Sequence, residues 1–240
     1  MNFPRGLYLR LALVTLAAVL VHGYHLGVDD SAIYIPAIKQ VADPSLYPFG
    51  AEFFLSHAHL SLFADLVGGT ARLSRLPADL VIFAWHGIGI FLLLLAGWRL
   101  LAACFESERA RWAGVALLAA AFSVPVAGTA LVIMDPYLTA RSLSTPATLF
   151  GIAEILAGRW RRAMMWLLLT AAIHPQMAFY AAAFAASLLV WPRIASKAGE
   201  GAPGVAMASL VGLPFLFDAQ PATGAAREAL LSRSYFFVGN

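Results

Sequence analysis

The sequence LVIFAWHGIGIFLLLLAGWRLLAAC runs from Leu80 to Cys104 and carries one charged residue, Arg99. A helix needs about 20 mostly apolar residues to cross the hydrocarbon core of a bilayer. This stretch meets both conditions, and it therefore predicts a membrane-spanning helix.

The composition of the whole chain points the same way. Of its 240 residues, 61% are hydrophobic and 12% are charged, and the mean hydropathy is +0.77. Soluble domains carry roughly 25% charged residues. We predict an all-α fold, a polytopic α-helical integral membrane protein forming a single transmembrane domain over residues 1–240. The net charge of +3 does not indicate a nucleic-acid partner, because the basic residues stand beside apolar runs, where they mark topology.

Further apolar segments lie on both sides of the central one. They cover residues 7–23, 112–128, 146–158, 163–173, 176–191 and 205–217. The fourth and fifth come from one longer run that His174-Pro175 interrupts, since proline removes a backbone hydrogen bond from a helix. We expect about seven spans in total.

The charges orient these spans. With the N-terminus in the cytoplasm, most basic residues fall on the inner side, including the cluster Arg159, Arg161 and Arg162. This satisfies the positive-inside rule. No Ala-x-Ala site follows the first span, so we read it as an uncleaved signal anchor in a bacterial inner membrane. The outer parts are then residues 24–77 and 218–240, and the apolar, aromatic ending after Ser232 indicates a truncated chain.

Two short helices are predicted in the long first outer loop, residues 24–77. Residues 31–41 read as a helix with Asp30 or Ser31 as its N-cap. Residues 58–76 carry apolar side chains at helical spacing: Leu60, Phe63, Ala64, Val67 and Ala71. That pattern predicts an amphipathic helix in the membrane interface, with an ordinary surface helix as the alternative.

Asp29 and Asp30 follow the first span directly. Two carboxylates beside a membrane are costly unless they face water, a metal or a polar substrate. They could act as general base or hold a divalent metal ion, with helix capping as the alternative. His57 and His59 are weaker candidates for completing such a metal site.

A second polar cluster lies between the third and fourth spans. Arg141 stands near a span start, where its guanidinium could bind a phosphate through two parallel hydrogen bonds. The alternatives are an ion pair with Asp135 or snorkelling to lipid headgroups. Asp135 and Tyr137 are further candidates for substrate contact.

The third cluster is the helix break itself. His174 and Gln176 flank Pro175, and irregular backbone at membrane depth usually lines a cavity. The local alternative is that both side chains satisfy backbone groups that Pro175 frees.

These features together resemble the GT-C superfamily of membrane glycosyltransferases. The resemblance rests on DDSAIYIPAIK from Asp29 to Lys39, YLTARSLSTP from Tyr137 to Pro146, and IHPQMA from Ile173 to Ala178. It implies a polyprenyl-phosphate-linked sugar donor on the outer face, with Asp29 or Asp30 as catalytic base or metal ligand. The hypothesis built on it gives Arg141 the donor phosphate and His174 a place in the cavity.

Two other classes stay open on the sequence. A membrane transporter or channel subunit also has broken helices and buried polar groups. A non-catalytic membrane assembly protein would fit the short chain.

Overall fold

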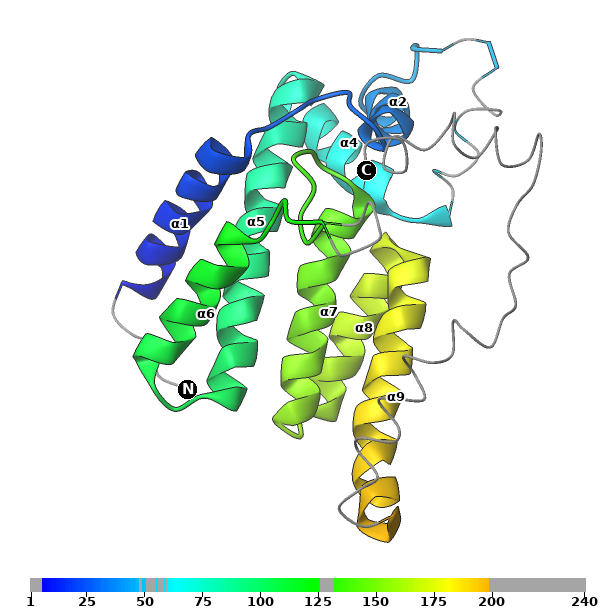
Figure 1. Cartoon of the computed structure of the whole chain (residues 1–240). Coiled ribbons are helices and arrows are strands. Elements are labelled where there is room, and N and C mark those ends of the chain that lie inside the picture. The colour runs from blue at the N-terminus through cyan, green and yellow to red at the C-terminus, as the bar shows by residue number, and fades with distance from the viewer. Residues whose placement is uncertain are drawn as a thin grey trace, which may run out of the picture. The chain divides into compact units, whose positions relative to one another are not determined.

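The computed structural model describes residues 6–47, 49–50, 55, 58, 60–125 and 132–198, and contains no strand among them. The predicted all-α class is confirmed for this part of the chain. Its helices, drawn in Figure 1, are α1 (Leu7–His22), α2 (Ser31–Ala42), α4 (Phe63–Ser74), α5 (Ala78–Cys104), α6 (Glu108–Ala120), α7 (Ala140–Leu156), α8 (Trp160–Ile173) and α9 (Pro175–Ala198). The chain divides into two compact units, Met1–Ala185 and Ala186–Asn240, and the first is described below.

Most predicted segments correspond to helices. The bounds of α1, α2 and α5 match the predicted segments closely. The predicted helix interruption is present at His174, whose backbone is extended (φ −152°, ψ 92°). The predicted boundaries of two segments are wrong. α7 begins at Ala140, ahead of the predicted residue 146, and α6 runs from Glu108 to Ala120 in place of residues 112–128. The predicted segments 205–217 and 218–240 lie outside the described residues.

Helix length separates α5 from its neighbours. Among the described residues, only α5 is both long enough and apolar enough to cross a membrane. α1 and the Pro175–Val190 part of α9 are apolar but shorter. α6 has 13 residues and α8 has 14, which at 1.5 Å per residue gives each about 20 Å of helix. A seven-span arrangement therefore remains a prediction.

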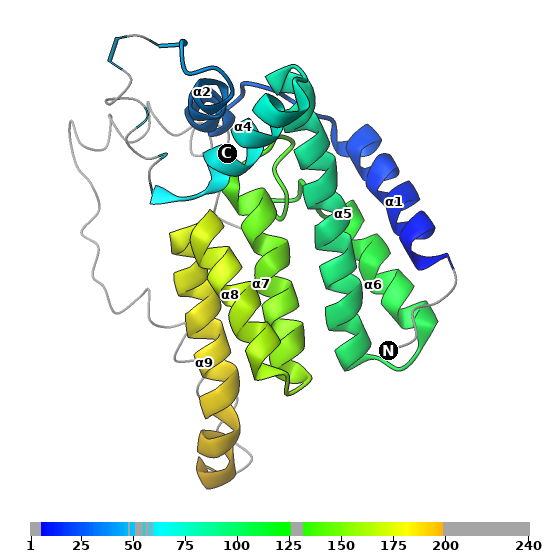
Figure 2. The ribbon, with the colours of Figure 1, turned by 180° about the vertical axis from the view of Figure 1, so that it is seen from behind.

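In the first unit α1, α5, α6, α7 and α8 run up and down, and α2 and α4 lie at one end of them (Figures 1 and 2). Charged residues near the helix ends therefore fall into two groups. At the basic end, the start of α1 meets the start of α6 through Arg10 and Glu108, 3.6 Å apart. The described charges there are Arg10, Arg99, Arg109, Arg111, Arg159, Arg161 and Arg162 against Glu106, Glu108 and Glu154. The opposite, acidic end carries Asp29, Asp30, Asp43, Asp65, Asp79 and Asp135 against Lys39, Arg72, Arg75 and Arg141.

The acidic end is built on one hydrophobic cluster. It joins α2, α4, α5 and the start of α7 through Ile38, Phe63, Val67, Ile82 and Leu143, all buried. The expected apolar face of α4 is thus present, but protein covers it, which is the arrangement of an ordinary surface helix. The helix starts at Phe63, so the predicted start at residue 58 is wrong, and Leu60 lies before it with 71% of its surface exposed.

Candidate functional site

The start of α7 explains both the misplaced boundary and the position of Arg141. Thr139 and Ser142 form a capping box: the Ser142 N–H donates to Thr139 Oγ1 (3.3 Å), and the Thr139 N–H donates to Ser142 Oγ (3.1 Å). Such a box satisfies two backbone donors that a helix start leaves unpaired. The helix therefore begins six residues before Pro146, and Arg141 lies in its first turn.

Arg141 forms an ion pair with Asp135, as the alternative interpretation expects. Arg141 Nη2 lies 2.5 Å from Oδ1 and 2.6 Å from Oδ2 of Asp135. Asp135 is nearly buried, whereas about a quarter of the Arg141 side chain is exposed. Only Nη2 is used, and within the described part of the chain Nε and Nη1 donate to no protein acceptor. Asp135 therefore holds the guanidinium in place while leaving donors for a ligand.

Asp29 and Asp30 lie in the exposed turn before α2. Asp30 is the N-cap residue of α2, one of the two predicted positions, but its side chain makes no cap hydrogen bond. The Ser31 hydroxyl donates instead to the Val28 carbonyl (2.6 Å). Asp29 has a left-handed backbone (φ 48°), a conformation that aspartate and asparagine tolerate better than most residues. Neither carboxylate is used in building the helix start.

The loop before α7 touches this turn. The His25 N–H donates to the Pro136 carbonyl (2.7 Å), and the Tyr137 hydroxyl lies within electrostatic range of the Asp30 backbone. Burial raises the pKa of Tyr137 to about 12, and the charges of Asp135, Asp30 and Asp29 add to that rise. All three acids therefore lie within electrostatic range of one phenol, which stays protonated at neutral pH.

The helix break forms a cavity beside these groups. Its volume is about 350 Å³, and its lining includes Tyr34 from α2, Ala140 from α7, and His174 and Gln176 at the break. The charge of Arg141 acts on both Tyr34 and His174, and burial raises the pKa of Tyr34. The structure thus brings Arg141, His174 and the Asp30 turn to one side of the bundle.

His174 caps the helix that follows it. The Met177 N–H donates to His174 Nδ1 (3.4 Å), so the predicted local role at the break is present. Burial, and to a smaller extent Arg141, lower the pKa of His174 below its ordinary value, so the ring is neutral at pH 7. Since Nδ1 accepts a hydrogen bond, the neutral ring carries its proton on Nε2 and can donate from it.

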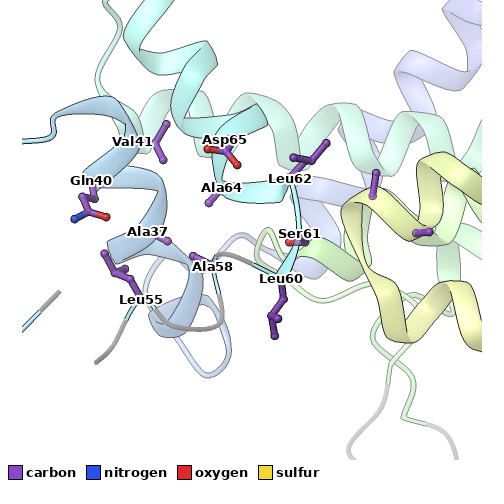
Figure 3. Close-up of a pocket in the computed structure, with 12 residues that line it drawn as sticks. Ala37, Gln40, Val41, Leu55, Ala58, Leu60, Ser61, Leu62, Ala64 and Asp65 are labelled. Carbon is purple, nitrogen blue, oxygen red and sulfur yellow. The ribbon is translucent and has the colours of Figure 1, made fainter. Parts of the chain in front are cut away.

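Figure 3 shows a second cavity, of about 430 Å³, which shares Leu60 and Ser61 with the first. It lies between α2 and α4, and its lining is mostly Ala, Leu and Val, with Gln40, Asp65 and Ser61 as its polar side chains. The Leu60-Ser61 segment therefore separates a largely aliphatic cavity from one lined by Tyr34 and His174.

The remaining site predictions have mixed outcomes. Gln176 lines the first cavity, and its amide also donates to the Tyr180 hydroxyl (3.4 Å). His57 and His59 lie outside the described residues. Within the described part of the chain, no group of three His, Cys, Asp or Glu residues could hold a metal ion.

The sequence interpretation favoured an aromatic interface belt over sugar stacking for Tyr34, and it missed His86. Tyr34 follows Asp30 by four positions, a spacing that places two residues on one helix face, and this signal was available. His86 lies in the middle of α5 with 1% of its surface exposed, and it hydrogen-bonds the Tyr137 carbonyl. Its position inside an apolar run could have marked it as a polar contact within the bundle.

Comparisons with protein-family models, with curated proteins and with solved structures gave no match to this chain. The functional assignment therefore rests on the residues and geometry of the site.

Proposed function

We propose that the protein is a GT-C-like membrane glycosyltransferase that takes sugar from a polyprenyl-phosphate donor on the outer face of the membrane. The observation that carries this proposal is the juxtaposition of an oriented arginine, Arg141, with the acidic turn at Asp30 and the cavity at His174. An anionic leaving group and a hydroxyl acceptor need a cation and a carboxylate close together.

A membrane location is supported by the outer surfaces of the helices. Large apolar side chains that are more than half exposed include Leu9, Leu13, Leu16, Leu20 and Val21 on α1, Met164, Met165 and Leu168 on α8, and Phe179 on α9. Soluble monomers rarely expose apolar patches of that extent, whereas lipid-facing surfaces require them. We propose about seven spans in the complete membrane domain, the shorter helices being accommodated within a bundle.

The charge difference between the two ends supports the orientation. The basic end has an excess of arginine, and the acidic end has an excess of aspartate. Under the positive-inside rule the basic end faces the cytoplasm, and the site faces outward in the inner membrane.

The chemistry follows from the charges of the site. Asp30 or Asp29 accepts the proton of an acceptor hydroxyl as its oxygen attacks the anomeric carbon. The bond from that carbon to the phosphate oxygen breaks, and polyprenyl phosphate leaves with its negative charge. Arg141 stabilises this charge through Nε and Nη1, while Asp135 keeps the guanidinium oriented.

The test is sugar transfer by membranes containing the protein, supplied with a radiolabelled polyprenyl-phosphate sugar. We expect Asp30→Asn or Asp29→Asn to lower the transfer rate by about 100-fold or more, the usual cost of losing a general base. Asp29→Asn keeps the left-handed backbone accessible, so its effect reports on the carboxylate. Asp43→Asn, which changes an exposed acid after α2, is the matched control. Full activity in both Asp29 and Asp30 variants would show that the acid assignment is wrong.

A transporter is the second candidate, because the break at His174 lies beside a cavity. It predicts solute uptake into proteoliposomes that polyprenyl-phosphate sugars do not change. A glycosyltransferase would show no such uptake, and its activity would require the polyprenyl-phosphate sugar donor.

A further inference from the structure

The basic end of the bundle contains a second organised group of charges. Glu154 is 2% exposed, near the end of α7, and its carboxylate lies between two arginines. Arg99 Nη1 from α5 is 3.5 Å from Oε1, and Arg159 Nε donates to Oε2. The Arg159 N–H also donates to the Glu154 carbonyl (2.8 Å). One buried acid therefore fixes arginines from two separate elements.

Positive charge exceeds negative charge around this acid. The charge of Arg162 also acts on Glu154, so three arginines surround one carboxylate. Arg162 is exposed, and its side chain makes no hydrogen bond or ion pair with the described residues. Arg159 uses only Nε among its side-chain donors. Guanidinium donors that are already oriented remain available at the surface, so little side-chain entropy would be lost on binding an anion.

The surface next to this group is apolar. Trp160 is 49% exposed at the start of α8, and Met164 and Leu168 continue along that helix with 57% and 62% exposure. The first turn of α8 has no side-chain cap and no acidic residue, so its positive dipole end adds to the arginine charge. A cationic group at the start of a helix that also exposes large apolar side chains matches a molecule with an anionic head and an aliphatic tail.

We propose that Arg159 and Arg162 bind the phosphate of an anionic phospholipid of the inner leaflet. Arginine pairs with phosphate oxygens through its planar donors, and the acyl chains would lie along α8. The proposal rests on the membrane location proposed above, and it is independent of sugar transfer.

The experiment counts phospholipids retained by the purified full chain, using native mass spectrometry. Equal amounts of phosphatidylglycerol and phosphatidylcholine are added in detergent. We expect the wild type to retain phosphatidylglycerol preferentially and Arg162→Gln to weaken that retention about fivefold, the effect of removing one basic residue near an anionic headgroup. Arg161→Gln removes the same charge from the neighbouring exposed residue and is expected to retain the preference.

Three results would overturn the proposal. Equal losses in Arg161→Gln and Arg162→Gln would indicate diffuse charge in place of a site. Displacement of phosphatidylglycerol by millimolar inorganic phosphate would assign the site to free phosphate. Absence of any lipid preference would exclude it altogether. Flotation with pure phosphatidylcholine vesicles tests the membrane location separately from the phospholipid site. A protein that floats but shows no headgroup preference would overturn the phospholipid site and leave the membrane location standing.

Discussion

At the scale of single residues, the site depends on how the Arg141 guanidinium is oriented and on which ring nitrogen of His174 carries the proton. Asp135 fixes Arg141, and Met177 fixes the His174 ring through Nδ1. Each contact leaves an unused donor: Nε2 of His174, which lines the cavity, and Nη1 or Nε of Arg141, whose charge acts on His174. These donors suit a phosphate or a sugar hydroxyl.

His174 offers a direct test of this arrangement by pH. Because its pKa is lowered, the ring takes up a proton in the folded protein only below its ordinary value of 6.5. The unfolded chain binds that proton first as the pH falls, so folding stability decreases below about pH 6.5. Modification by diethyl pyrocarbonate, read by mass spectrometry, should reach half its maximal rate below pH 6.5.

The Arg141→Gln variant sharpens that measurement. Removing the Arg141 charge raises the pKa of His174, so the pH at half-maximal modification should move upward. Arg72→Gln, which changes an exposed residue of α4, should leave that pH unchanged. An unchanged midpoint in Arg141→Gln would mean that the two side chains do not interact.

The sequence predicted several residues of the site but few of their contacts. It identified Asp29, Asp30, Arg141 and His174, because charged and polar residues beside apolar runs are conspicuous. It left open whether Arg141 pairs with Asp135, since that depends on how the loop folds back onto α7. The role of His86 depends on a contact between α5 and residue Tyr137, and no local pattern encodes it.

At the scale of helices, the capping box at Thr139 sets the start of α7 and thereby the position of Arg141. The sequence interpretation placed this segment at residues 146–158 because that stretch is apolar, and it overlooked the Thr139–Ser142 pair. Pro146 is the seventh residue of the helix, where it cannot donate the usual backbone hydrogen bond to residue 142, yet the helix continues to Leu156.

Thr139→Ala should destabilise the protein by about 1 kcal/mol, the usual cost of an N-cap, and Thr139→Ser should restore it. Thermal unfolding of the detergent-solubilised protein measures both. A destabilised Thr139→Ser variant would indicate that the methyl group matters more than the cap.

Gly68 allows α2 and α4 to pack closely against each other. A Cβ on Gly68 would lie 2.5 Å from the Ile38 carbonyl oxygen, whereas a Cβ on Gly69 meets nothing within 4 Å. Gly68→Ala should therefore cost about 1–3 kcal/mol through overpacking, and Gly69→Ala should be neutral or stabilising. Thermal unfolding of the two variants measures the difference, and equal effects would contradict the close packing of these helices.

At the scale of the whole molecule, the two ends of the bundle differ in charge and in chemistry. The sequence predicted this asymmetry correctly because arginines flank the apolar runs at alternate loops. It could not predict the number of spans, since the lengths of α6 and α8 are set by packing against longer neighbours.

Topology can be read with the chain's one cysteine. Cys104 is exposed at the basic end, so a membrane-impermeant maleimide added to intact cells should label it only after permeabilisation. Ser45→Cys in a Cys104→Ser background should be labelled from outside. The reverse pattern would place the site in the cytoplasm.

The most direct test of the central claim is binding of polyprenyl phosphate to the purified protein. Wild type should bind it at least about tenfold more tightly than Arg141→Gln, because a charge-assisted pair is lost. Unphosphorylated polyprenol should bind both proteins alike. Equal binding of polyprenyl phosphate by the wild type and Arg141→Gln would contradict the account.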